Sequence, residues 1–125
     1  MNFEFLLIAL IIGTVVDWLL QSKYQAMNKT KNLGALLEHS FTYSIFTGMF
    51  VGWILDISPG LVLGMIWAIL FITHVIIDNR LFVKFLMYLK GYTWEECNNK
   101  EYAWLEVGID QILHMIVILI IAAVL

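Results

Sequence analysis

Apolar residues form four long stretches along the chain, separated by shorter polar segments. The stretches cover about residues 3–22, 33–55, 61–88 and 104–125. An α-helix needs about 20 mostly apolar residues to cross the hydrocarbon core of a bilayer. The pattern therefore predicts an all-α, polytopic membrane protein: a four-helix transmembrane bundle that forms one domain over residues 1–125.

Turn residues and charged residues indicate where these predicted spans begin and end. Ser58, Pro59 and Gly60 are typical of a tight turn, so we expect a short connection between the second and third spans. Residues 81–90 are apolar with two lysines, which predicts either a continuation of the third span or a helix in the plane of the lipid headgroups. The first stretch lacks a basic start and carries Asp17, so we expect a retained span rather than a signal peptide.

Small residues recur one helical turn apart in the second and third spans. Gly48 and Gly52 form one such pair, and Gly60 and Gly64 form another. Pairs of this kind favour close approach of neighbouring membrane helices, although glycine is also common in such helices without that role. Both interpretations stay open on the sequence alone.

The composition excludes several classes of protein. Hydrophobic residues make up 62% of the 125 residues and charged residues 14%, whereas a soluble domain is nearer half apolar and a quarter charged. The mean hydropathy of +0.87 also excludes an intrinsically disordered chain. A net charge of −3 gives no reason to expect a nucleic-acid partner, and a single cysteine, Cys97, excludes an intramolecular disulfide.

The basic residues predict the orientation of the chain in the membrane. All 7 Lys and Arg residues lie in two segments: residues 23–31, between spans one and two, and residues 80–100, which cover the end of span three and its connection to span four. In membrane proteins the cytoplasmic loops carry the excess of Lys and Arg. We therefore expect a multi-pass protein of the cytoplasmic (inner) membrane, with the basic loops in the cytoplasm and both termini outside. The cations are Lys23, Lys29, Lys31, Arg80, Lys84, Lys90 and Lys100.

Six acidic and imidazole side chains lie within or at the edges of the predicted spans. Two pairs with a spacing of four, His74 with Asp78 and Asp110 with His114, place both members on one helix face. In antiparallel helices, all six groups fall near the cytoplasmic ends of the spans. The six side chains are Asp17, His39, His74, Asp78, Asp110 and His114.

This set of side chains predicts a metal site inside the membrane. A charged side chain at the centre of a membrane helix costs about 2.5–3.5 kcal/mol on insertion scales, and a bound cation offsets that cost. Carboxylate and imidazole ligands suit Zn, Mn or Fe, and soluble four-helix bundles hold di-metal centres in the same way. We therefore expect one or two divalent metal ions, with all six side chains as candidate ligands.

Three other interpretations of the six residues stay open. Hydrogen bonds between helices would use the same groups, although each contributes only about 0.6 kcal/mol on average. Haem bound by histidine pairs is less consistent with His74 and His114, because each has an aspartate on its own helix face. A proton or ion pathway would need polar residues in the outer halves of the spans, where the sequence is mostly apolar.

The predicted site favours a metal-dependent hydrolase that acts on a lipid or another phosphoester at the cytoplasmic leaflet. A metal ion would lower the pKa of a water molecule that serves as the nucleophile. Gln21 would orient the water or the substrate, and Lys29 or Arg80 would attract the phosphate. Membrane lipid is the expected partner, and association into a homo-oligomer stays open. The alternative is a non-enzymatic membrane protein: a metal-linked or proton-linked transporter, or a phage protein that perturbs membranes or acts as an effector.

The same residues resemble a known family over nearly the whole chain. It is the DUF3307 family of small bacterial and phage membrane proteins, catalogued as a domain of unknown function, which implies four membrane helices. The family pattern usually has a histidine four residues before the first aspartate, where this chain has Gly13. More distantly, the motifs are similar to those of proteins named membrane-bound metal-dependent hydrolases. The matching segments are Asp17–Gln21, Met27–Lys29, Leu36–His39 with Tyr43, His74–Asp78 and Asp110–His114.

Overall fold

The computed structural model describes residues 3–124, and over these residues every regular element is a helix, which confirms the all-α prediction. The predicted domain and the last predicted span both reach Leu125, which lies outside the described residues. The elements are α1 (Phe3–Leu19), α2 (Lys23–Asn28), α3 (Leu33–Ile54), α4 (Leu61–Asp78), α5 (Leu81–Leu89), the 3₁₀ helices η1 (Glu96–Asn98) and η2 (Lys100–Tyr102), and α6 (Ala103–Val124).

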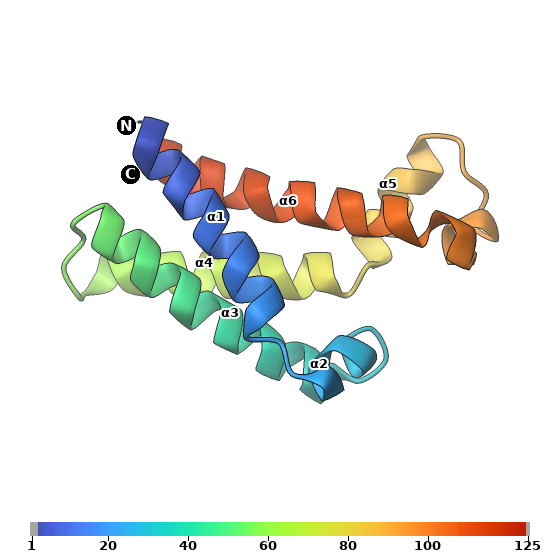
Figure 1. Ribbon diagram of the computed structural model, residues 1–125, viewed down its shortest axis with the longest axis horizontal. Coiled ribbons are helices and arrows are strands. Elements are labelled where there is room, and N and C mark those ends of the chain that lie inside the picture. The colour runs from blue at the N-terminus through green and yellow to red at the C-terminus, as the bar shows by residue number, and fades with distance from the viewer. Residues whose placement is uncertain (1–2, 125) are drawn as a thin grey trace.

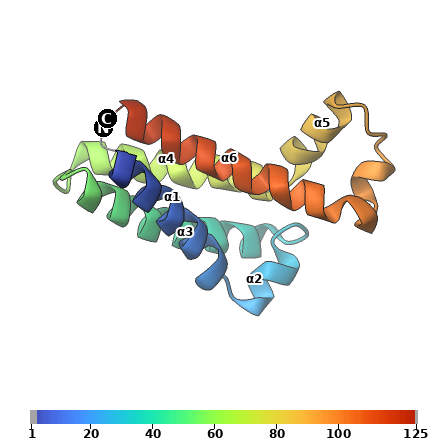
Figure 2. The same ribbon diagram turned by 45° about the horizontal axis from the view of Figure 1, so that its top comes forward.

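Four long helices, α1, α3, α4 and α6, form a bundle (Figures 1 and 2). The helices α3 and α4 are packed against each other along their length, α1 packs on α3 and α6, and α6 packs on α4. Both termini and the α3–α4 turn lie at one end of the bundle, whereas α2 and α5 lie at the other end (Figure 1). The segments that carry all 7 Lys and Arg residues, 23–31 and 80–100, belong to this second end.

The chain changes direction between α1 and α3, and side-chain hydrogen bonds cap the starts of α2 and α3 there. The Ser22 Oγ accepts a hydrogen bond from the Gln25 backbone N–H at 3.2 Å, and the Gln25 Oε1 accepts one from the Ser22 N–H at 2.9 Å. This reciprocal pair is a capping box that starts α2. The Asn32 Oδ1 accepts from the Ala35 N–H at 3.2 Å and starts α3 in the same manner.

The apolar segment predicted over residues 61–88 is divided into two helices. Arg80 adopts a left-handed backbone conformation with φ +63°, which ends one helix and redirects the chain into the next. The helix α5 buries Val83 and Met87, whereas the apolar side chains of Phe82, Phe85 and Leu89 are exposed. The structure therefore has a separate helix over these residues and not a continuation of α4.

Two segments are long and apolar enough to cross a membrane: Leu61–Asp78 and Lys100–Val124. Among the residues that the structure describes with their side chains, α1 contributes a shorter apolar segment, Leu10–Leu19. The 22 residues of α3 include Glu38 and His39, which lower its hydropathy. The structure therefore provides two candidate spans among the described helices.

Large apolar side chains are nevertheless exposed on the surfaces of all four long helices. Examples are Ile11 on α1, Phe50 on α3, Met65 on α4 and Ile120 on α6, each at least 40% exposed. Exposed apolar residues spread around a bundle are expected where lipid is the solvent.

The glycines of α3 lie at close contacts between helices, whereas the glycines near the start of α4 do not. A Cβ added at Gly48 would lie 2.0 Å from Cδ1 of Trp67, and one added at Gly52 would lie 2.7 Å from Cδ1 of Leu63. A Cβ added at Gly60 or at Gly64 would have no described atom within 4 Å. Of the two glycine pairs, the close-approach interpretation therefore holds for Gly48 and Gly52 and not for Gly60 and Gly64.

Candidate metal centre

The six predicted side chains converge in the interior of the bundle. Asp17 comes from α1, His39 from α3, and the two pairs with a spacing of four come from α4 and α6. Their exposed fractions lie between 0 and 6%, so all six are buried. They form two groups of possible ligand atoms, with the atoms of each group within 4.8 Å of one another. The first group is Asp17, His39, His74 and Asp78, and the second is Asp78, Asp110 and His114.

In the first group, several polar atoms surround the Nε2 atom of His39. This nitrogen lies 3.0 Å from Asp17 Oδ1, 3.1 Å from Asp78 Oδ2 and 3.1 Å from Nε2 of His74. A single ring nitrogen carries at most one hydrogen, so it can donate to only one of these acceptors at a time. Four ligands around a tetrahedral zinc, at bond lengths of ~2.0–2.2 Å, lie ~3.4 Å from one another. The donor spacing of the first group is therefore close to that of a metal site.

In the second group, the side chain of His114 lies close to the carboxylates of Asp78 and Asp110. His114 Nδ1 donates to the backbone carbonyl of Asp110 at 2.9 Å, because a carbonyl oxygen can only accept. That bond fixes a proton on Nδ1 and leaves Nε2 with its lone pair in the neutral ring, as in histidines that bind metals. The Nε2 atom lies 3.7 Å from Asp78 Oδ1.

No described residue provides a hydrogen-bond partner for the atoms of this second group. The three atoms, Asp78 Oδ1, Asp110 Oδ1 and His114 Nε2, are all buried. Burying a carboxylate oxygen without a partner is costly, so such atoms are usually paired or bound to a cation. The second group therefore has the donor chemistry of a divalent-cation site.

Lys29 extends into the first group. Its Nζ donates to Asp78 Oδ2 at 2.8 Å and lies 3.5 Å from Nε2 of His39. The lysine is only 8% exposed and follows α2 directly. The sequence placed Lys29 near the site as a phosphate-binding residue; the structure brings its ammonium into contact with a predicted metal ligand.

The other two predicted polar residues lie at the edge of the centre. Gln21 Nε2 is 3.3 Å from Nε2 of His39, which is close enough to orient that ring. Arg80 Nη1 lies 3.4 Å from Glu106 Oε2, and the buried Arg80 Nε has no partner among the described residues. Gln21 therefore contacts the cluster directly, whereas the ion pair of Arg80 is with Glu106.

Two further residues support the ligand atoms, and sequence reasoning gave them little or no role. Gln111 Nε2 donates to Asp17 Oδ2 at 3.0 Å and to Asp110 Oδ2 at 3.3 Å. The Tyr43 ring stacks on the His74 ring, with centroids 3.9 Å apart. Gln111 is a polar residue within an otherwise apolar helix, and this polar position could have indicated its role from the sequence.

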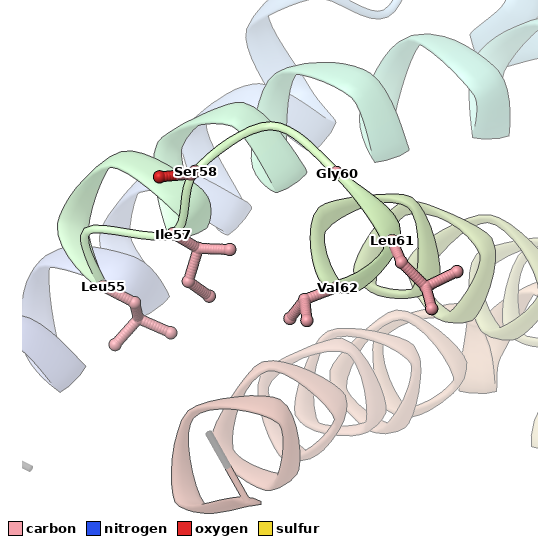
Figure 3. A pocket seen from close by; sticks show the side chains of 6 residues that line it. All are labelled: Leu55, Ile57, Ser58, Gly60, Leu61 and Val62. Atoms are coloured by element: carbon pink, nitrogen blue, oxygen red, sulfur yellow. The ribbon is translucent and has the colours of Figure 1, made fainter.

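A hollow in the surface lies at the opposite end of the molecule from this cluster. It has a volume of about 470 Å³ and lies at the α3–α4 turn, lined by apolar side chains and Ser58. Figure 3 shows Leu55, Ile57 and Val62 beside this turn. None of its six lining residues is an acidic, basic or histidine residue.

One comparison with known proteins gives a match. The profile of a family described as "Protein of unknown function (DUF3307)" matches residues 5–125, which include all six candidate ligands. No curated protein and no solved structure matches the chain.

Proposed function

Since this chain belongs to the DUF3307 family, whose description assigns no activity, we propose a function from the site itself. The protein is a membrane-embedded hydrolase that uses a divalent metal ion to cleave a lipid phosphoester at the cytoplasmic leaflet. Its metal ligands come from the six buried side chains of α1, α3, α4 and α6.

One observation carries this proposal: three residues grouped closely enough to hold a metal ion each have a buried atom without a described hydrogen-bond partner, namely Asp78 Oδ1, Asp110 Oδ1 and His114 Nε2. Catalytic zinc sites commonly have three protein ligands and keep a further position open for water or substrate. Two carboxylates and one imidazole also suit Mn and Fe. The second group therefore resembles a catalytic site more than a closed structural one.

A bound divalent ion supplies a Lewis acid toward a phosphoryl oxygen and makes water more acidic. The residues of the chain do the positioning. Gln21 contacts His39 and orients the water or the substrate from the edge of the cluster. The free N–H of Arg80 attracts the phosphate, since guanidinium groups bind phosphate oxygens well.

Two hollows support a substrate with an anionic head and an apolar chain. A polar pocket of about 190 Å³ at the basic end is lined in part by Lys29, Lys31 and Asn79. An apolar groove of about 360 Å³ runs between α4 and α6 and reaches Thr73, the residue before His74. The lipid proposal rests on these two features and on the buried cluster.

The orientation in the membrane is part of the same proposal. All four long helices cross the cytoplasmic membrane, with segments 23–31 and 80–100 in the cytoplasm and both termini outside. The support is the positions of the cations at one end of the bundle (Figure 1) and the exposed apolar side chains along the four helices.

The test begins with metal content and proceeds to turnover. Protein purified in detergent with Zn²⁺ or Mn²⁺ supplied should retain metal, and Asp110→Asn should retain much less. Reconstituted protein should then release a phosphorylated or dephosphorylated product from phospholipid vesicles, and Asp110→Asn should lose at least ~100-fold in rate, because a metal ligand is removed. A metal content near zero in both proteins would overturn the proposal.

A second candidate function, proton-linked or metal-linked transport, is favoured by one observation. Buried hydroxyls on α3, Ser40 Oγ and Thr47 Oγ1, and the Trp67 Nε1 of α4 have no partner among the residues that the structure describes. Unpaired polar atoms inside a membrane bundle are typical of ion and proton pathways. Ion flux into liposomes without turnover of any lipid would favour transport over hydrolysis.

A further inference from the structure

The two ligand groups are not equivalent, although they share Asp78. The Oδ2 atom of Asp78 belongs to the first group and accepts a hydrogen bond from Lys29 Nζ at 2.8 Å. The Oδ1 atom faces the second group and has no partner among the described residues. One oxygen of the carboxylate therefore has a cation beside it, whereas the other has none.

The ammonium of Lys29 lies against two of the four side chains of the first group. It contacts Asp78 Oδ2 and His39 Nε2, two of the four ligand atoms of that group. A lysine ammonium is a compact point charge with three hydrogens. A cation of this kind compensates the carboxylates of the group and leaves less room for a metal ion.

The backbone holds Lys29 in this position. The Lys29 N–H donates to the carbonyl of Gln25 at 2.9 Å, which ends α2, and Gln25 is itself 5% exposed and part of the capping box with Ser22. The start of α3 is fixed by Asn32 three residues later. Because both flanks are capped, the ammonium is presented by an ordered segment.

The charges of the cluster also favour one metal ion. Three buried carboxylates, Asp17, Asp78 and Asp110, lie with the single ammonium of Lys29, while Arg80 is paired with Glu106 outside them. With neutral imidazoles, Lys29 and one divalent ion together neutralise the three carboxylates. A second divalent ion beside Lys29 would leave an excess of positive charge in a buried site, which is costly.

We propose that the centre binds one divalent ion, held by Asp78, Asp110 and His114, and that the Lys29 ammonium is the permanent cation of the Asp17, His39, His74 and Asp78 group. This inference rests on the proposed function, because it specifies how the same metal centre is built. Lys29 is then a positioning residue that fixes Asp78 for the ion, in place of a second metal.

The first test compares metal stoichiometry in Lys29→Met and in a matched control. Wild-type protein in detergent, equilibrated with Zn²⁺ and desalted, should retain one ion per chain by elemental analysis. Lys29→Met should retain two ions per chain, because the first group then lacks its cation and its four ligand atoms are free. Lys23→Met removes an exposed lysine of the same segment and should retain one ion.

Each possible number of Zn²⁺ ions retained per chain leads to one conclusion. Two ions per wild-type chain would show that metal displaces Lys29, which overturns this inference and leaves the proposed function intact. One ion in Lys29→Met would show that the first group is not a metal site without its lysine and would also overturn the inference. No ion in the wild type would overturn the proposed function itself.

A second pair of variants keeps the inference testable if Lys29→Met does not fold. His39→Gln and His114→Gln make the same change of side chain in the first and second groups. His39→Gln should still retain one ion per chain, whereas His114→Gln should lower the Zn²⁺ affinity by at least ~100-fold, because only His114 is a ligand. Equal losses in the two variants, or a larger loss in His39→Gln, would overturn the assignment of the ion to the second group.

Discussion

The amide of Gln111 donates a hydrogen bond to Asp17 Oδ2 at 3.0 Å, and this bond joins the last helix to the first across 94 positions of sequence. The same nitrogen lies 3.3 Å from Asp110 Oδ2, so one amide holds a carboxylate from each ligand group. Groups that hold metal ligands in this way tune affinity without touching the ion.

Replacing Gln111 should therefore weaken metal binding without abolishing it. In Gln111→Leu, Asp17 and Asp110 lose a donor, and the Zn²⁺ affinity should fall by about 10–100-fold, as is typical for residues that support ligands. Competition with a coloured chelator measures the change. Ile112→Ala, an exposed neighbour on the same helix, is the control and should leave the affinity unchanged. An unchanged affinity in Gln111→Leu would contradict this role.

The pair of Lys29 and Asp78 should be strongly coupled in stability. Asp78→Asn removes one partner of a buried ion pair and leaves the Lys29 charge without its carboxylate, which should cost about 3–5 kcal/mol. The double variant Asp78→Asn/Lys29→Met should be more stable than Asp78→Asn, because the unpaired charge is gone. Reversible unfolding in mixed micelles, without added metal, measures the free energy of unfolding of each variant. Additive effects of the two substitutions would contradict the contact.

Two glycine substitutions should have different effects on stability. Gly48→Ala places a Cβ 2.0 Å from Cδ1 of Trp67, so the helices α3 and α4 must separate or the ring must move, at a cost of about 1–3 kcal/mol. Gly64→Ala meets no described atom within 4 Å and should be neutral or stabilise the helix by up to ~1 kcal/mol. Thermal unfolding in detergent distinguishes the two. Metal stoichiometry should remain unchanged in both variants.

Thiol labelling should report the orientation in the membrane. In a Cys97→Ser background, Ser58→Cys lies at the α3–α4 turn and Asn99→Cys at the opposite, basic end. A membrane-impermeant maleimide should label Ser58→Cys in spheroplasts, and Asn99→Cys only after the membrane is opened. Labelling of Asn99→Cys in intact spheroplasts would reverse the proposed topology.

Glu96, in the polar loop before α6, should titrate at a lower pH than an ordinary glutamate. Its carboxylate accepts hydrogen bonds from the Thr93 backbone N–H at 2.7 Å and from the Thr93 hydroxyl at 2.9 Å, and these bonds hold the pKa of Glu96 below its usual value of 4.5. The folded pKa is depressed, so the stabilisation is present above pH 4.5 and is lost as the pH falls through the lower, folded value. The amide proton shift of Thr93 should follow this titration. In Glu96→Gln, the shift should no longer change over that range.

The sequence by itself determined which residues meet. Hydrophobic stretches and the four-residue spacings of His74 with Asp78 and of Asp110 with His114 placed these groups on helix faces at one level, because helix geometry converts spacing into direction. The positions of the Lys and Arg residues also indicated that segments 23–31 and 80–100 lie at the same end of the bundle. Only short-range geometry and burial of apolar surface are needed for these conclusions.

Only the tertiary structure decided how the groups are paired. The contact between Lys29 and Asp78 depends on how α2 is capped and folded back, and the contact between Gln111 and Asp17 depends on the rotation of α6 against α1. The break at Arg80 likewise follows from a left-handed backbone conformation that hydropathy does not record. Pairings of this kind join residues far apart in the chain, and their energies arise from packing that no local pattern contains.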